Sequence, residues 1–261
     1  MKFCTLASSS SGNSTLVSAG KTNILIDAGI SMRRITAALG QLGLCPTDLT
    51  GILVTHEHTD HVCGLKMLTK HYGIPVYTGR VVAEDLVQML PELADVITPF
   101  TAGVDFALGD LEIHSFHTPH DVPESVGYRI TDGKSVFAYA TDLGTVTQEV
   151  YANIQGADAI VAEANHDLEM LKNGPYPYPL KKRILSDHGH LSNALSGKFC
   201  AALGESGTKK ILLAHLSKHN NTPELAYHTV SETMESKGVG VGRDVTLHVA
   251  PADWASALYT V

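Results

Sequence analysis

Residues 56–61 read His-Glu-His-Thr-Asp-His, so metal-ligating side chains crowd into one short segment. In extended chain the side chains at positions i and i+2 point to the same side, so His56 and His58 can reach one cation. Asp60 and His61 follow at a turn that opens a helix, and they can reach a second cation nearby. The spacing therefore predicts a site for divalent metal ions. The alternative interpretation is a histidine-rich surface turn without a ligand.

This pattern follows a buried strand and resembles the signature of the metallo-β-lactamase superfamily, whose members are two-sheet hydrolases with one or two metal ions. The resemblance implies three further ligands: a histidine after the antiparallel strands, an aspartate that bridges both metals, and a histidine after a final buried strand. His120, Asp142 and His215 stand at these positions, in this order. The implied ligand set is therefore His56, His58, Asp60, His61, His120, Asp142 and His215.

Several histidines outside this set leave their roles open. His117 lies in the same loop as His120 and competes with it for the ligand position. His120 is preferred because residues 126–130 resemble the strand that follows this ligand in the nuclease branch of the superfamily. His117 then either lies behind the ligands or is exposed. The role of His166 is undecided, and a structural role is expected for His114, which falls within a strand pattern.

The implied ligand set suits hydrolysis. Two cations about 3.5–4 Å apart share a hydroxide, which Asp142 also bridges, and lower its pKa towards neutrality. They also polarise the oxygen of the substrate and stabilise the charge that builds in the transition state. Imidazoles combined with carboxylates suit zinc, manganese or iron, and the sequence does not choose among these metals.

The second half of the chain narrows the class of substrate. The loop 7–13 and the segments 163–167, 174–193 and 215–221 resemble the WalJ (YycJ) family. That family comprises cytoplasmic bacterial enzymes regarded as DNA exonucleases, related to the ribonuclease Z group and to phosphodiesterases of phosphonate pathways. The resemblance covers nearly the whole chain and is most specific in residues 174–193. It implies a phosphodiesterase, and more narrowly a DNA exonuclease.

His190 stands where the ribonuclease Z-like branch keeps a histidine that is not a ligand. Near the implied hydroxide its imidazole can donate to a phosphoryl oxygen or protonate the leaving alkoxide. Glu163 can hold that imidazole in one tautomer. The residues expected to act in catalysis are therefore His190, Glu163 and Asp60. The alternative for His190 is a histidine at a helix start without a chemical role.

A run of three basic residues, Lys181, Lys182 and Arg183, lies close in sequence to the expected catalytic histidine and beside Tyr176 and Tyr178. Cations that pair with phosphates, next to aromatic rings that stack on bases, are typical of a grip on single-stranded nucleic acid. The alternative is a solvated helix start. The position of the run beside the expected site favours contact with the substrate.

Small polar residues are further candidates for substrate contact. The loop that contains Ser11 and Asn13 can place backbone N–H groups against an anion. Ser217 and Lys218, just past the last implied ligand, can contact phosphate in the same way. Asp27 ends a strand near the metal edge, where we expect it to orient a ligand histidine rather than to bind metal itself.

These side chains need strand ends and loops to present them. Short strand patterns separated by turns alternate with helical patterns, which indicates an α/β fold, and no linker divides residues 1–261. The pattern therefore favours a single domain with two sheets between layers of helices. The resemblance makes this more specific, since it implies a four-layer αββα metallo-β-lactamase sandwich of two mixed β-sheets flanked by helices. The expected strands are 2–7, 15–19, 23–26, 51–55, one within 76–90, 104–106, 111–116, 125–130, 135–139, 159–162, 211–214 and 245–249. Helices are expected after Ser31, from Leu65, within 76–90, and over 180–185, 192–203 and 223–235.

Composition excludes several classes of protein. No apolar run approaches the roughly 18 residues of a membrane span, and the N-terminus lacks the apolar core of a secretory signal. The four cysteines form no Cys-x-x-Cys pair, so we expect free thiols in a reducing cytoplasm. A net charge of −8 argues against a protein that coats nucleic acid, although a nuclease with a local basic patch stays possible.

The leading hypothesis is a two-metal phosphodiesterase whose substrate is nucleic acid, most specifically DNA. The first competing hypothesis is a small-molecule hydrolase on the same fold, such as a cyclic phosphodiesterase, a lactonase or a thioesterase. A metal-binding protein without catalysis and a di-iron redox protein are two weaker hypotheses. No membrane partner is expected, and the oligomeric state is left open.

Overall fold

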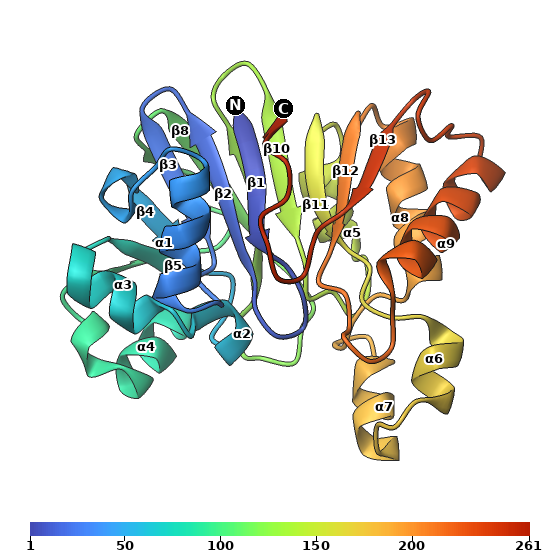
Figure 1. The fold of residues 1–261 in the computed structure, drawn as a ribbon, viewed down its shortest axis with the longest axis horizontal. Coiled ribbons are helices and arrows are strands. Elements are labelled where there is room, and N and C mark those ends of the chain that lie inside the picture. The colour runs from blue at the N-terminus through green and yellow to red at the C-terminus, as the bar shows by residue number, and fades with distance from the viewer.

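Two seven-stranded β-sheets lie face to face, and helices cover the outer face of each sheet (Figure 1). The structure is a computed structural model that describes residues 1–261. The architecture confirms the predicted αββα sandwich of two mixed sheets. Its helices are all too short or too polar to span a lipid bilayer.

The first sheet has the strand order β14-β1-β2-β3-β4-β5-β6. It is antiparallel from β14 to β3 and parallel from β3 to β6. A tight turn at Gly20-Lys21 joins β2 to β3, with Gly20 at a φ of 56°. The bounds are β1 (Lys2–Ala7), β2 (Ser14–Ala19), β3 (Thr22–Ile26), β4 (Gly51–Leu53), β5 (Val76–Gly79), β6 (Ile97–Phe100) and β14 (Tyr259–Thr260).

The second sheet has the order β13-β12-β11-β10-β9-β8-β7. Its strands β7 to β10 form an antiparallel meander, and β10 to β13 run parallel. The bounds are β7 (Phe106–Leu108), β8 (Leu111–His117), β9 (Val126–Thr131), β10 (Val136–Ala140), β11 (Ala159–Glu163), β12 (Lys210–Ala214) and β13 (Thr246–Val249).

Alternating side chains along the strands build three apolar layers. On β1, Phe3 belongs to the cluster between the two sheets, whereas Leu6 belongs to the cluster beneath the helices of the first sheet. On β12, Leu212 lies between the sheets and Leu213 packs under the helices of the second sheet. Because both faces of these strands are buried, apolar residues stand at adjacent positions, as in residues 211–214 of β12, instead of alternating with polar ones.

Helices α1 (Met32–Gln41), α3 (Leu65–Tyr72) and α4 (Arg80–Met89) cover the first sheet, and Ser31 caps α1 as predicted. The second sheet is covered by α5 (Gln148–Ile154), α8 (Asn193–Glu205) and α9 (Pro223–Ser236). Short helix α2 (Thr59–Val62) and two 3₁₀ turns (Pro46–Asp48 and Pro91–Leu93) complete the half around the first sheet.

Two short helices, α6 (Leu168–Asn173) and α7 (Tyr178–Ile184), project from the lower edge of the molecule in Figure 1. We call residues 168–184 the α6–α7 arm. It connects β11 to α8, and it carries the basic run that the sequence singles out.

The structure differs from the sequence prediction at several elements. The strand expected at 104–106 is β7, shifted to Phe106–Leu108, because the turn at Gly109 sets the pairing of Leu108 with Leu111. The edge strand β6 was not predicted, since Pro99 weakens its strand pattern. The terminal strand β14 and helices α5 and α6 were also not predicted, because each is too short to show a periodic pattern.

Candidate metal centre

The seven implied ligands all lie at one edge of the two sheets, where parallel strands end. Asp142 follows β10 and His215 follows β12, and residues 56–61 follow β4. Asp142 and His215 have φ values of 59° and 58°, and Asp27, which follows β3, has 61°. They are the only residues other than glycine with positive φ, a conformation that side chains with a Cβ avoid. Strained backbone is thus concentrated where the polar side chains converge.

A close approach of three loops holds this edge together. The N–H of Gly29 donates to the carbonyl of Asn13, and the N–H of Asn13 donates to the carbonyl of Asp60. A Cβ on Gly29 would lie 1.6 Å from the carbonyl oxygen of Asp60. Only glycine therefore allows the loop of Asn13 and the segment of the first ligands to meet.

The first group of ligand atoms comes from His56, His58 and His120. One ring nitrogen of each residue lies within 4.8 Å of the other two. Nε2 of His120 is 3.3 Å from Nδ1 of His58. His56 is fully buried, and its Nε2 has no hydrogen-bond partner. A buried polar atom without a partner is costly, so an atom that faces two other imidazoles is explained by a bound cation.

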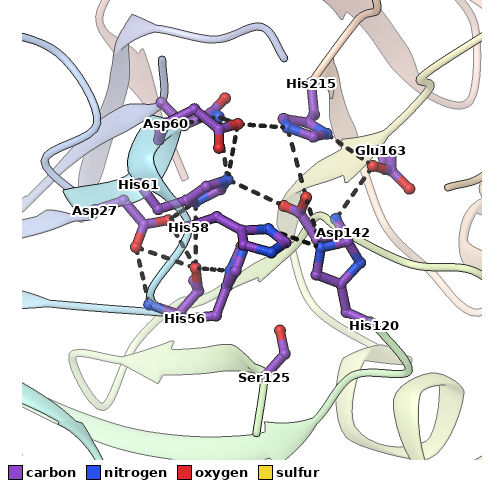
Figure 2. A network of polar contacts seen from close by, with 12 residues as sticks. Asp27, His56, His58, Asp60, His61, His120, Ser125, Asp142, Glu163 and His215 are labelled. Atoms are coloured by element: carbon purple, nitrogen blue, oxygen red, sulfur yellow. Dashed lines mark hydrogen bonds and ion pairs between the residues drawn. The ribbon is translucent and has the colours of Figure 1, made fainter. Parts of the chain in front are cut away.

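The second group comes from Asp60, His61 and His215, and Asp142 lies between the two groups (Figure 2). Nε2 of His61 is 3.5 Å from Oδ2 of Asp142, and Nε2 of His215 is 3.5 Å from its Oδ1. The same Oδ1 is 3.7 Å from Nε2 of His120 in the first group. The carboxylate of Asp142 therefore lies near ligand atoms of both groups.

Buried acceptors orient the ligand rings from behind. Asp27 is fully buried and accepts from Nδ1 of His61 at 2.8 Å and from the N–H of Thr55 at 2.8 Å. The contact expected between Asp27 and a ligand histidine is therefore present. With Nδ1 engaged, Nε2 of His61 faces the ligand atoms around it.

Glu163 performs the same task for two rings. Its Oε1 accepts from Nδ1 of His190 at 2.9 Å and from Nδ1 of His215 at 2.9 Å. Its Oε2 accepts from the N–H groups of Leu143 and Leu191. The contact with His190 was predicted from the sequence, whereas the contact with His215 was not.

The charges of the site favour cations. Burial raises the pKa of Glu163, but the imidazoles of His190 and His215 outweigh burial and lower it to about 2. Burial lowers the pKa of His215, but carboxylates, first that of Asp142, raise it to about 10. A field that holds a buried imidazole in its charged form also attracts metal cations.

The residues expected to contact the substrate lie in different parts of the site. Arg183 and Ser217 line a cavity of about 200 Å³ together with His190. Ser11, Ser217 and Lys218 line a second cavity of about 240 Å³. Asn13 is fully buried, with Nδ2 3.2 Å from Nε2 of His61, so it lies at the ligands themselves.

The basic run on the α6–α7 arm does not act as one unit. The ammonium group of Lys181 donates to the carbonyl of Lys172. Lys181 and Lys182 line an open surface depression that also contains Tyr178. Only Arg183 lines the cavity next to His190.

The remaining histidines lie apart from the ligand groups. Of the two alternatives for His117, a place behind the ligands or exposure to solvent, the structure shows exposure. His188 is also exposed. Nδ1 of His114 forms a hydrogen bond with Oδ1 of Asp105. His166 is buried with no partner on either ring nitrogen, and burial lowers its pKa to about 4.

One residue at the site was missed. Oδ1 of Asp121 lies 3.3 Å from Nε2 of His120, and its Oδ2 accepts from Nε of Arg183. The only signal in the sequence is that Asp121 directly follows an implied ligand.

Comparisons with known proteins agree with this geometry. A family model described as a beta-lactamase superfamily domain matches residues 22–216. The exodeoxyribonuclease YycJ of Bacillus anthracis is 40% identical over 251 residues, which are 95% of this chain and 94% of that protein. The exodeoxyribonuclease WalJ of Streptococcus pneumoniae is 37% identical over 261 residues, 98% of this chain and 97% of that protein.

A solved structure shares the fold. The metallo-beta-lactamase fold protein YhfI from Bacillus subtilis superposes with a TM-score of 0.71 at 16% identity, over 98% of this chain and 99% of that chain. This likeness extends over both sheets and all the helical layers of the molecule.

Proposed function

The chain belongs to the beta-lactamase superfamily, and on this basis we propose that it is a metal-dependent phosphodiesterase that acts on DNA as an exonuclease. Two relatives that match it over nearly the whole chain are named exodeoxyribonucleases. The observation that carries the chemistry is the position of His190, which Glu163 holds beside the ligand groups although it belongs to neither triad of ligands.

The residues fit two divalent cations, and we propose zinc, manganese or iron. His56, His58 and His120 would hold one, Asp60, His61 and His215 the other, and Asp142 both. The unpartnered, buried atoms His56 Nε2 and Asp142 Oδ2 support this fit. When bound, such a pair lowers the pKa of a water molecule towards neutrality and polarises a phosphoryl oxygen.

The side chains of the protein supply the proton transfer. Glu163 accepts from Nδ1 of His190, so Nε2 of that ring is left to face the substrate. From there Nε2 donates a proton to the leaving oxygen, or a hydrogen bond to a phosphoryl oxygen. The pKa of about 2 keeps Glu163 charged at neutral pH, which stabilises positive charge on the ring. Asp60 acts as a ligand whose carboxylate also orients the attacking water.

Contacts with the rest of the substrate come from both sides of the site. Arg183 and Ser217 line one cavity, and Ser11, Ser217 and Lys218 line the other, so phosphate groups on either side of the cleaved bond meet cationic or hydroxyl groups. Lys181 and Lys182 lie on the outer face of the arm, where they can contact the backbone of a longer DNA.

We also propose a cytoplasmic location for the protein. The four cysteines, Cys4, Cys45, Cys63 and Cys200, are free thiols. Exposed free thiols are typical of a reducing compartment, where DNA is the substrate at hand.

The second candidate function is hydrolysis of a small phosphodiester, lactone or thioester. The small volumes of the two cavities and the net charge of −8 favour it, because neither suits a large polyanion.

Hydrolysis assays distinguish these functions. The metal-loaded protein is given bis-p-nitrophenyl phosphate and end-labelled single- and double-stranded DNA, with manganese or zinc. We expect cleavage of both kinds of substrate and its collapse in His190→Ala. His188→Ala, an exposed histidine two positions earlier, is the control that keeps activity. Intact DNA alongside rapid turnover of a lactone or thioester would show that the nuclease assignment is wrong.

A further inference from the structure

The inner face of the α6–α7 arm adjoins the candidate metal centre through an ion pair. Nε of Arg183, on α7, donates to Oδ2 of Asp121, in the loop after β8. Oδ1 of the same carboxylate lies 3.3 Å from Nε2 of His120 and 3.9 Å from Nε2 of His58. The side chain of Asp121 therefore contacts both the arm and the first group of ligands.

We propose that the cavity between the arm and the site binds the nucleotide next to the cleaved bond, with Arg183 as its phosphate-binding residue, Tyr176 as its base-stacking residue and Asp121 as the residue that positions Arg183. This inference rests on the proposed function. It adds a substrate subsite and a positioning residue.

The guanidinium group is only partly used by the protein. It carries five N–H donors in a flat fork, and Asp121 takes the one on Nε. Neither terminal nitrogen of Arg183 donates to another residue, and its side chain is 57% exposed. The terminal N–H groups are therefore available to bind two oxygens of one phosphate.

Asp121 holds the guanidinium in a fixed place. Its Oδ2 accepts from Nε of Arg183, while its other oxygen lies against the ligand histidines. The guanidinium is thereby anchored through Nε, on the side away from its terminal nitrogens, and these stay directed into the cavity that Arg183 lines.

Tyr176 offers the surface for a base. It lines the same cavity as Arg183, and it is half-buried. His219 contacts it edge-on, with ring centroids 5.8 Å apart at 71°. Stacking on an aromatic ring tolerates every base, as an enzyme that degrades DNA requires.

The size of the cavity limits what it can hold. Its volume of about 200 Å³ is below the range of roughly 300–1,000 Å³ in which drug-sized ligands are enclosed. It excludes a stacked run of bases, so only the phosphate and the base next to it can enter the cavity while the rest of the nucleotide stays outside. Tyr178, Lys181 and Lys182 face a different depression, so they are not part of this subsite.

Binding can be measured apart from catalysis. Titration calorimetry of the metal-loaded protein with deoxyadenosine monophosphate, inorganic phosphate and deoxyadenosine separates the contributions of phosphate and base. We expect Arg183→Ala to raise the Kd for the nucleotide by about 10- to 100-fold, because charged hydrogen bonds are lost. Arg183→Lys should not restore binding, since an ammonium group lacks the fork.

Two further variants test the assigned roles. Tyr176→Ala should weaken binding of the nucleotide but not of inorganic phosphate, and Tyr176→Phe should restore it. Asp121→Asn, which keeps an acceptor for Nε, should lose less nucleotide affinity than Asp121→Ala. If Asp121→Asn loses as much nucleotide affinity as Asp121→Ala, the positioning role is contradicted.

Arg243→Ala is the matched control, because Arg243 pairs with Asp244 on the surface in a similar ion pair. It should leave nucleotide binding and DNA cleavage unchanged. In Arg183→Ala the loss of kcat/KM on DNA should exceed the loss on bis-p-nitrophenyl phosphate by about tenfold or more.

The outcomes separate this inference from the proposed function. Unchanged nucleotide binding in Arg183→Ala and Tyr176→Ala overturns the subsite even if the protein cuts DNA. Nucleotide binding that depends on Arg183, in a protein that leaves DNA intact, supports the subsite and overturns the exonuclease.

Discussion

The imidazole of His190 donates from Nδ1 to Oε1 of Glu163 across 2.9 Å, and this bond fixes the tautomer in which Nε2 carries no proton unless the ring is charged. The same oxygen holds His215, so one buried carboxylate orients an implied ligand and the proposed acid together. Glu163 thereby couples the two parts of the proposed chemistry.

Glu163→Gln is expected to reduce activity without changing the shape of the site. Oε1 of Glu163 accepts from Nδ1 of His190, Nδ1 of His215 and the N–H of Asp142, and Oε2 accepts from two backbone N–H groups. Either orientation of the amide therefore places its NH₂ group against at least two donors. We expect kcat/KM on bis-p-nitrophenyl phosphate to fall about 10- to 100-fold, as for residues that orient metal ligands in general. The control is Glu149→Gln, an exposed glutamate that accepts from the N–H of His117. Activity equal to the wild type in Glu163→Gln would contradict the orienting role.

The number of metal ions bound per chain is expected to show that His120, and not His117 in the same loop, is a ligand. His120 faces His58 at 3.3 Å, whereas His117 is exposed. We expect about two ions per chain in the wild type and about one in His120→Ala, because one tri-histidine group is broken. His117→Ala should keep the wild-type content. Elemental analysis after dialysis measures this, and the reverse pattern would make His117 the ligand.

The fold was predictable because its strands are buried on both faces. Continuous apolar runs such as residues 51–54 and 211–214 mark strands, and the polar residue that ends each run marks the functional edge. His56 was a candidate because of its spacing to His58, and the resemblance implied His215, which directly follows the second of these runs. Short elements such as α6 and β14 have no such runs, so they were not predicted.

Contacts across the site were less predictable. Arg183 and Asp121 are 62 residues apart in the sequence. Their pairing depends on the paths of the loop after β8 and of the α6–α7 arm, and a hydrophobic periodicity in the sequence does not predict these paths. Neighbours in a helix point about 100° apart, so Lys182 and Arg183 cannot share one face even though they are adjacent in the sequence. The role of each residue in a charged run can therefore be assigned only from the structure.

The stability of the protein is expected to fall in mild acid because of His166. Burial lowers its pKa to about 4, from 6.5. Between these two values the unfolded chain binds a proton that the folded protein does not, so the free energy of unfolding decreases as the pH falls from 6.5 to about 4.

Urea denaturation at pH 7 and pH 4.5, with a chelator present, measures this effect. The loss of stability should be larger in the wild type than in His166→Gln by roughly 2–3 kcal/mol, because glutamine does not titrate. His188→Gln, at an exposed position, should behave like the wild type. Equal losses in the wild type and His166→Gln would show that His166 does not titrate in this range.

Asp27 is expected to support metal binding by its charge and its accepted hydrogen bonds rather than by its backbone. It accepts from Nδ1 of His61 and from the N–H and the hydroxyl of Thr55, and its φ is 61°. Asparagine tolerates this φ better than most side chains do, so Asp27→Asn removes the charge without adding strain. We expect the affinity for zinc to fall about 10- to 100-fold, since the amide cannot hold both donors. In Asp27→Ala, backbone strain should cost about 1–2 kcal/mol of stability in addition.

Competition with a chromophoric zinc chelator gives the affinity, and thermal unfolding of the metal-free protein gives the stability. Asp110→Asn, an exposed aspartate that accepts from the N–H of Lys21, is the control. If zinc affinity stays unchanged in Asp27→Asn while the melting temperature falls, Asp27 acts only in folding. If both fall in Asp27→Ala but only affinity falls in Asp27→Asn, the carboxylate orients His61 and the left-handed backbone is a separate contribution to stability.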